Sequence, residues 1–400
     1  MGKIECIVLD SFGQVNQILE NEWDDVAAQT LAGIYMTFRW SRTWWEFYGA
    51  THKLRIFFFR HEGKLVAIFP MYIQRITLGI SSISIARLIG SNIPPRVFDP
   101  PIESALASEL IPLLVRKLVE DEGCDLVSLG PVSGQWANRT DIQKSAKQIP
   151  RDFAKFEAKA YDVYTFYDLP NSFDEYYNSL SHKEKRIRRQ KMNIFNKDFK
   201  PQIEVLTEPS DIENELLPFM EMHTIQWNKV GMPGYFNAWP NATAFNRKIA
   251  HEMGTVGKTW LMRVTVDGKP VLYQYAFVLG DRCYWQVSAR IYGESWERYS
   301  LGATNTLIFL QHCIKMGVKK VESGLGSYTY KTKLGGVEVP TAKLRFISRR
   351  VSSRLKVSMF RIIVGFITIS YHKIYYKRIQ PRLPAKFRRP ISMGWIRLGY

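Results

Sequence analysis

Four side chains that can take part in acid–base chemistry lie close together in the last third of this 400-residue chain: Glu322, Tyr328, Tyr330 and Lys331. A carboxylate can take a proton from an amine or anchor the amine, and a phenol can protonate a leaving group. An ammonium group can bind an acceptor or stabilise negative charge. Such groups suit the attack of an amine on a carbonyl carbon. The alternative for Glu322 is an exposed strand carboxylate without a catalytic role.

The stretch from 258 to 336 supplies the elements that must position these groups. Three β-branched and aromatic runs are separated at Asp267-Gly268 and at Gly280-Asp281, where glycine permits the positive φ of a tight turn. They predict a three-stranded antiparallel meander. Four residues on it are candidates for an acceptor pocket, although aromatic strand positions are usually core: Tyr273, Gln274, Trp285 and Gln286.

A helix is predicted after the meander, with Gly317 as its stop and a short strand from Val318 to Glu322 following it. Its first turn contains a candidate N-cap and small residues: Ser300, Leu301, Gly302 and Ala303. Bare N–H groups at the positive end of a helix suit the pyrophosphate of a cofactor. An ordinary helix cap explains the same residues, because the pattern is not GxGxxG.

This order of meander, helix and strand resembles the acyl-CoA-binding core of the GNAT acyltransferases. The sequence is similar to the BioF2-like group, which includes CelD-like acetyltransferases of bacterial polysaccharide clusters. It also resembles the FemABX peptidyltransferases, whose second domain ends in a Phe-Lys-x-x-Phe-Gly type of signature. Here that signature would be Tyr330-Lys331-Thr332-Lys333-Leu334-Gly335, which keeps the lysine and changes both aromatic positions.

The resemblance implies acetyl-CoA or a longer acyl-CoA as donor, held at Ser300–Ala303, and no metal. In GNAT folds a splayed strand pair offers backbone N–H groups to the pantetheine and the thioester oxygen, so few side chains are obligatory. Glu322 falls near the family's usual acid. BioF2-like proteins also have a His-x-x-x-Trp element near the cleft, which corresponds to His223 and Trp227. Without the resemblance, a lone histidine there is more often a packed or surface residue.

An internal repeat indicates two such domains. Gly63-Lys64 aligns with Gly268-Lys269 at an offset of 205, and Gly123 aligns with Gly317 at an offset of 194. The difference of 11 corresponds to a longer loop around 91–101 in the first half. We therefore predict an α/β fold with a mixed sheet and tandem GNAT-like domains, the FemABX-like architecture. The predicted domains are residues 1–150 and 160–345, followed by a basic extension over 346–400.

The positive charge is concentrated in that extension. From 341 to 400 there are 15 Lys and Arg and no Asp or Glu, which leaves 40 basic against 37 acidic residues in the rest. A basic amphipathic segment suits the anionic inner leaflet of a membrane. No stretch approaches about 18 uncharged apolar residues, so a peripheral contact is favoured over a span. The alternative is a C-terminal helix packed on the second domain with a solvated basic face.

Other features narrow the class of protein. The composition, 46% apolar and 14% aromatic, indicates a folded chain, and four scattered cysteines signal neither a disulfide framework nor zinc. The N-terminus lacks a signal pattern, so we expect a cytoplasmic protein, peripheral on the inner face of the membrane if the extension binds lipid.

A single helix is predicted over 173–195. Its later part is strongly basic, which is typical of a solvent-exposed helix face or of a surface that binds the phosphates of CoA, a lipid carrier or tRNA.

Three functions follow from these features. The first is an acyl-CoA-dependent N-acyltransferase acting on an amino sugar or a lipid-linked intermediate of envelope or exopolysaccharide assembly; the pathway is implied by the resemblance alone. The second is a FemABX-like transferase that uses aminoacyl-tRNA, although no heptad hairpin for a coiled-coil arm is present. The third is a catalytically silent, membrane-associated binding protein. No DNA partner is expected.

Overall fold

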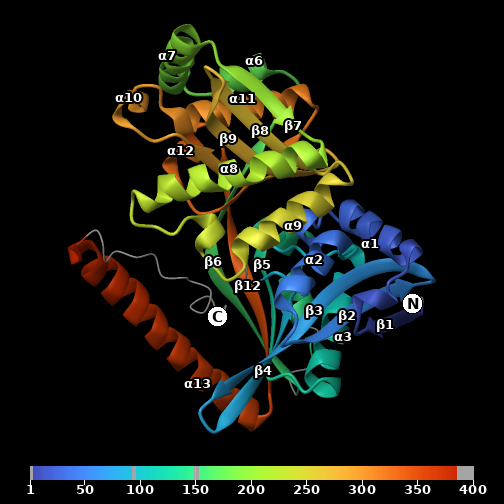
Figure 1. The fold of residues 1–400 in the computed structure, drawn as a ribbon. Coiled ribbons are helices and arrows are strands. Elements are labelled where there is room, and N and C mark those ends of the chain that lie inside the picture. Colours follow the sequence, from blue (N-terminus) through green and yellow to red (C-terminus); the bar gives the residue numbers. More distant parts are fainter. Residues whose placement is uncertain (1–2, 92–95, 148, 150–152, 385–400) are drawn as a thin grey trace. The chain divides into compact units, whose positions relative to one another are not determined.

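The computed structural model describes residues 3–91, 96–147, 149 and 153–384 (Figure 1). Within these ranges the chain forms two compact units. Unit 1 comprises residues up to 162 together with those from 339 onward, and unit 2 comprises residues 163–338.

Unit 1 is built on a mixed sheet with the strand order β1-β2-β3-β4-β5-β12. Its strands are β1 (Ile4–Leu9), β2 (Lys53–His61), β3 (Lys64–Leu78), β4 (Ser81–Leu88), β5 (Leu126–Ser133) and β12 (Val337–Ser348). Its helices are α1 (Gln17–Gln29), α2 (Phe38–Tyr48), α3 (Ala107–Arg116), α4 (Gly134–Arg139), α5 (Ile142–Lys147) and α13 (Val351–Thr368). Shorter helical turns are η1 (Phe12–Gln14), η2 (Ile34–Met36), η3 (Ser104–Leu106), η4 (Lys117–Asp121), η6 (Ile369–Ile379) and η7 (Gln380–Arg382).

Unit 2 has a second mixed sheet with the order β6-β11-β10-β9-β8-β7. Its strands are β6 (Ala154–Asp168, which begins in unit 1), β7 (Gln202–Leu206), β8 (Thr259–Val266), β9 (Lys269–Leu279), β10 (Arg282–Arg290) and β11 (Lys320–Leu325). Its helices are α6 (Phe173–Ser179), α7 (His182–Phe199), α8 (Pro209–Asn228), η5 (Tyr235–Asn237), α9 (Ala242–Gly254), α10 (Glu294–Glu297), α11 (Leu301–Lys315) and α12 (Thr329–Lys333).

The two units repeat one order of elements, which confirms the predicted mixed α/β fold with tandem halves. In unit 1 the meander β2-β3-β4 is followed by α3 and then by β5, which pairs parallel to β4. In unit 2 the meander β8-β9-β10 is followed by α11 and then by β11, which pairs parallel to β10. Asp267 and Gly268 both adopt positive φ, as the predicted tight turn requires.

Helices cover both faces of the unit 2 sheet (Figure 1). On one face α6, α7 and α11 share an apolar core with alternate residues of the strands, including Leu272, Cys283 and Trp285. On the other face Phe219 of α8 stacks against Tyr273 and Tyr275 of β9. Alternate residues along β9 therefore contact different helices, as the two-residue period of a strand dictates.

The single helix predicted over 173–195 is wrong, because the structure divides it into α6 and α7. Leu180 is extended, with ψ 153°. Ser181 then caps a new helix, because its side chain accepts a hydrogen bond from the N–H of Glu184. A capping serine inside an otherwise helical pattern starts the second helix in a new direction.

The prediction that no segment is long and apolar enough to span a membrane also needs correction. Helical structure continues without interruption from Val351 to Arg382, and this 32-residue segment meets the length and composition of a span. Within unit 1, α13 packs Val357 and Phe360 against a core shared with β3, β4, β5 and β12. Its opposite side is a row of exposed apolar residues, here called the α13 stripe: Val351, Leu355, Met359, Ile362, Phe366 and Ile369.

Candidate active site

The central feature of unit 2 is a fork between two parallel strands. β10 and β11 pair at only three positions, from Arg282–Lys320 to Tyr284–Glu322. Beyond this point β10 runs on to Arg290 with a bulge between Trp285 and Val287. Bulges bend a strand and increase its twist, so β10 turns away from β11. After Tyr284, the backbone N–H and C=O groups on this edge of β10 therefore no longer pair with β11.

Two side chains of α8 bind the edge of β10 that β11 no longer reaches. The Nδ1 of His223 lies 2.9 Å from the carbonyl oxygen of Ser288, and the Oε1 of Gln226 accepts the N–H of Arg290 at 3.1 Å. The N–H and C=O of one extended residue point to the same edge, so the N–H of Ser288 also faces the fork. Side chains of α8 thus bind two backbone groups of this edge of β10, on the edge that the N–H of Ser288 also faces.

Both ring nitrogens of His223 are engaged. Its Nε2 accepts the N–H of Tyr235 at 3.0 Å, which makes Nδ1 the protonated nitrogen that donates to Ser288. Burial lowers the pKa of this imidazole to about 4. His223 is therefore neutral, and it ties the loop before η5 to β10. The neighbouring Trp227 has its ring 5.9 Å from the imidazole.

The start of α11 lies beside a guanidinium group. Ser300 occupies the N-cap position with φ 50°, but its side chain makes no capping hydrogen bond. The N–H groups of Ala303 and Thr304 donate to the Ser300 carbonyl, and those of the first turn before them have no partner within the helix. A Cβ on Gly302 would lie 3.5 Å from the Nη1 of Arg290. The start of α11 and Arg290 together form a positively charged site at the end of β10.

Lys331 lies on the other side of the fork. Its Nζ donates to the carbonyl oxygen of Ser323 at 2.8 Å, directly after the last β11 residue that pairs with β10. The side chain is 4% exposed, and the ammonium lies 5.0 Å from the ring centroid of Tyr328. The rings of Tyr328 and Tyr330 are 5.9 Å apart. Burial, followed by the nearby Tyr328, raises the pKa of Tyr330 to about 12.

Glu322 is separate from this group. Its carboxylate is 3% exposed and accepts hydrogen bonds from the Tyr164 hydroxyl, at 2.5 Å, and from Arg282. The alternative of an exposed strand carboxylate is therefore wrong. The carboxylate is instead a member of a buried ion pair, with an acceptor site already occupied by Tyr164.

The four meander candidates do not share one pocket. Tyr273 donates its hydroxyl to Glu215 at 2.6 Å, and Trp285 packs in the apolar core beneath α11. Gln286 lies at the bulge, where its Nε2 donates to the carbonyl of Tyr284. Gln274 is completely buried, and neither atom of its amide has a hydrogen-bond partner in the described part of the chain. It lies opposite Ser288 in the register of β9 and β10.

Sequence reasoning missed Arg290 and Gln226. Arg290 lies just after the predicted third strand and is the last residue of β10, ten positions before Ser300, and only the turn through α10 brings the two together. Gln226 lies between His223 and Trp227, which were chosen because of the resemblance. Within the described ranges, no group of three or more His, Cys, Asp or Glu could hold a metal ion.

Unit 1 has a corresponding fork, but the chain fills it. β4 and β5 pair only from Ile85–Leu126 to Arg87–Ser128. Past this point the N–H of Phe98 donates to the carbonyl of Pro131 at 2.8 Å. Asp99 accepts the N–H and the hydroxyl of Ser133 at 2.8 and 2.6 Å. Phe98 and Asp99 belong to the longer loop that the sequence repeat located.

Comparisons with known proteins found one family model and several similar folds. The model of the acetyltransferase (GNAT) domain family matches residues 181–332. A crystal structure of FemX has a TM-score of 0.63 at 11% identity, covering 84% of this chain and 98% of its own. A conserved protein of unknown function from Bacteroides thetaiotaomicron VPI-5482 has a TM-score of 0.51 at 13% identity, with 83% and 98% covered. A tandem GNAT protein from the clavulanic acid biosynthesis pathway has a TM-score of 0.40 at 12% identity, with 86% and 98% covered.

No curated protein matches the sequence of the chain. At identities this low, the solved structures establish likeness of fold alone. Residues 181–332 thus match the model of the GNAT-type acetyltransferase domain, in a chain whose fold is similar to that of FemX.

Proposed function

We propose that unit 2 is an N-acyltransferase that moves an acetyl or longer acyl group from acyl-CoA to an amine. The observation that carries the proposal is the open fork between β10 and β11, with a positive helix start on one side and Lys331 on the other. A diphosphate suits the helix start and Arg290, because bare N–H groups and a guanidinium both bind phosphate oxygens. A thioester arm could then enter the fork.

The reaction needs few groups beyond those at the fork. The amine nitrogen attacks the thioester carbon, the C–S bond breaks, and the proton lost by the amine balances the departing thiolate. The ammonium of Lys331 and the N–H of Ser288 stabilise the negative oxygen in the transition state. Tyr330, which stays protonated because its pKa is raised, is the proposed proton donor to the thiolate, with Tyr328 beside it.

Because Glu322 is buried in an ion pair, the role proposed for its carboxylate is electrostatic. Because Arg282 and Tyr164 already hold it, we assign it to anchoring the neutral amine by accepting a hydrogen bond from one of its N–H groups, rather than to direct proton removal. The acceptor we propose is an amino sugar or lipid-linked amine of envelope or exopolysaccharide assembly. That choice rests on the similarity to BioF2-like and CelD-like proteins.

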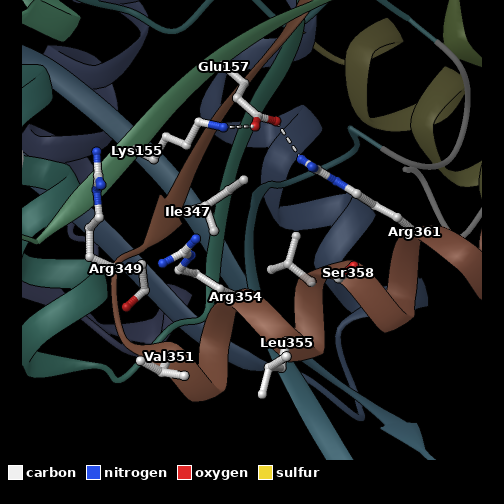
Figure 2. A pocket seen from close by; sticks show the side chains of 11 residues that line it. Lys155, Glu157, Ile347, Arg349, Val351, Arg354, Leu355, Ser358 and Arg361 are labelled. Atoms are coloured by element: carbon white, nitrogen blue, oxygen red, sulfur yellow. Dashed lines mark hydrogen bonds and ion pairs between the residues drawn. The ribbon is translucent and has the colours of Figure 1, made fainter.

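A place on the inner face of the cytoplasmic membrane fits such an acceptor. Figure 2 shows a groove of about 510 Å³ in unit 1, where the start of α13 meets the ends of β6 and β12. Arg349, Arg354 and Lys155 line it next to Val351 and Leu355, which begin the α13 stripe. Basic side chains beside an exposed apolar row are the pattern of a helix that lies in a lipid interface.

Calorimetric titration tests the donor. We expect acetyl-CoA or a longer acyl-CoA to bind in the micromolar range, and Gly302→Glu to abolish binding because its carboxylate meets the phosphates. Gly302→Ala is the matched control, since its Cβ reaches Arg290 only at an ordinary contact distance of 3.5 Å and should leave binding within about twofold. Absence of binding to any acyl-CoA by a folded protein would refute the proposed donor.

Aminoacyl-tRNA is the second candidate donor, because α7 presents exposed cations near the start of α11. Lys191 of α7 donates to the carbonyl of Arg298 at 2.5 Å, which places this helix beside the turn before α11. Its exposed basic residues include Lys183, Arg186 and Arg189. If tRNA is the donor, a triple change of these residues to Ser should weaken aminoacyl-tRNA binding and reduce its salt dependence. The same change should leave acyl-CoA binding intact. Binding of neither donor would leave a non-catalytic binding protein.

A further inference from the structure

The groove at the start of α13 is strongly basic. Four basic residues line it against one acid among the described lining residues, which gives a net charge of +3: Lys155, Arg349, Arg354 and Arg361 against Glu157. Its volume of about 510 Å³ lies within the range of about 300–1,000 Å³ that is usual for small-ligand sites. The groove is therefore large enough for a ligand and positively charged.

The one acid is already compensated by two of these cations. The carboxylate of Glu157 lies 3.0 Å from the Nζ of Lys155 and 2.5 Å from the guanidinium of Arg361. Burial raises the pKa of Glu157, but the hydrogen bonds from Lys155 and Arg361 outweigh burial and lower it, so the carboxylate is charged near neutral pH. Figure 2 shows these three side chains together, and Arg349 and Arg354 apart from Glu157.

Arg349 and Arg354 supply the excess positive charge. Both residues are exposed, and in the described part of the chain neither guanidinium forms an ion pair. A guanidinium group offers paired N–H donors whose geometry matches the oxygens of a phosphate. Two such groups on one groove favour a phosphate-bearing ligand over a neutral one.

The groove also continues into the α13 stripe. Val351 and Leu355 line the groove and are 72% and 63% exposed. From there the stripe follows one side of the helix at spacings of three and four residues as far as Ile369, about 27 Å at about 1.5 Å per residue. Val357 and Phe360 pack into the core on the other side. A basic groove joined to an apolar row matches a ligand in which a phosphate is linked to acyl chains.

We propose that this groove binds the head group of an anionic phospholipid, with the phosphate held by Arg349 and Arg354 and the acyl chains along the α13 stripe. A second copy of the chain fits the stripe less well. Residues 341–400 include 15 Lys and Arg and no Asp or Glu, so two copies would bring like charges together. The proposal deepens the membrane location given above and rests on it, but it does not depend on the acyl-CoA donor.

Calorimetric titration of the full chain with three soluble probes tests the ligand class. Dihexanoylphosphatidic acid should bind, and glycerol 3-phosphate, which lacks only its acyl chains, should bind at least about tenfold more weakly. Dihexanoylphosphatidylcholine, which has no net charge, should also bind at least about tenfold more weakly than the phosphatidic acid. Equal binding of glycerol 3-phosphate and the phosphatidic acid would make the ligand a soluble ester and overturn the lipid assignment. No binding of the phosphatidic acid would overturn the site itself.

Two matched double variants test the residues. Arg349→Gln with Arg354→Gln should weaken binding of dihexanoylphosphatidic acid at least about tenfold. Lys144→Gln with Lys269→Gln makes the same change of net charge at exposed positions on α5 and β9, and its affinity should stay within about twofold of the wild type. Unchanged binding by the arginine variant would refute the site.

Two further measurements separate this site from the alternatives. Gly302→Glu should keep the phosphatidic acid affinity, and the arginine double variant should keep the acyl-CoA affinity, so failure of the lipid site and failure of the donor site are distinguishable. Analytical ultracentrifugation without lipid should find a monomer. A dimer that Leu355→Glu with Phe366→Glu dissociates would show that a second copy covers the stripe, and would overturn the lipid as its occupant.

Discussion

At the scale of residues, backbone groups and side chains both contribute to the proposed site at the fork. Lys331 was identified from a signature whose aromatic positions are changed, and the structure places its ammonium on the Ser323 carbonyl where β10 and β11 separate. Arg290 and Gln226 were not identified, because their roles depend on a strand bulge and a helix crossing that no spacing encodes. Glu322 was expected at the right strand position, but its ion pair with Arg282 depends on a residue 40 positions away.

Replacement of Lys331 should affect catalysis more than donor binding. Lys331→Met is expected to slow thiol release from acyl-CoA, assayed with a panel of small amines, by about 10²–10³-fold, because it removes an oxyanion donor. The dissociation constant of acyl-CoA should change less than about threefold, since phosphate contacts dominate ground-state binding. Lys331→Arg keeps the charge and should recover part of the rate. A rate equal to that of the wild type in Lys331→Met would remove this residue from the mechanism.

The titration of His223 should make the free energy of unfolding depend on pH. Its pKa is depressed from 6.5 to about 4 in the folded state, so the unfolded chain binds the proton more readily. The stabilisation is complete above the unfolded pKa and is lost as the pH falls toward 4. Urea unfolding followed by tryptophan fluorescence should show a loss of about 2 kcal/mol from this group between about pH 7 and pH 5. His223→Gln should be less stable at neutral pH and lack this component; an unchanged pH dependence would contradict the assignment.

At the scale of elements, periodicity and turn chemistry predicted most of what the structure shows. Two Gly-containing turns and one apolar helix pattern predicted the meander, α11 and the strand after it. The internal repeat predicted that the chain contains two similar halves. The division of α6 from α7 was missed because a serine in a helical pattern reveals its capping role only through its backbone conformation. A C-terminal helix was expected only as an alternative, packed on the second domain, whereas α13 packs within unit 1. Its length was not predicted because charged residues break each apolar run, while a helix gathers the apolar residues on one side.

The α13 stripe should bind anionic membranes. Leu355 and Phe366 are 63% and 71% exposed, so Leu355→Glu with Phe366→Glu should leave the fold intact. Co-sedimentation with phosphatidylglycerol vesicles should fall by at least about tenfold, since two apolar side chains no longer enter the interface. Ile18→Glu with Ile203→Glu changes two exposed apolar residues elsewhere and should bind like the wild type. Equal binding by both double variants would mean that the stripe does not contact lipid.

At the scale of the whole molecule, a duplicated fold has acquired two different forks. In unit 2, side chains of α8 bind the edge of β10 that lies past the pairing with β11, whereas Phe98 and Asp99 of a loop bind the corresponding part of β5 in unit 1. The sequence located the extra loop, but its length alone did not say that it enters the sheet.

This difference predicts one donor site per chain. Titration of acyl-CoA should give a stoichiometry of about one, because the loop of unit 1 already uses the backbone groups that a second donor would need. Asp99→Ala should destabilise the protein by about 1–3 kcal/mol, since it leaves the Ser133 N–H without its acceptor. Two equivalent acyl-CoA sites would show that the unit 1 fork is not closed in solution.

The most direct test of the account is a crystal structure with a non-hydrolysable acetyl-CoA analogue. The account predicts the diphosphate within hydrogen-bonding distance of the Gly302 N–H and the Arg290 guanidinium, and the thioester mimic between Ser288 and Lys331. An analogue bound outside the fork of unit 2 would contradict the central claim.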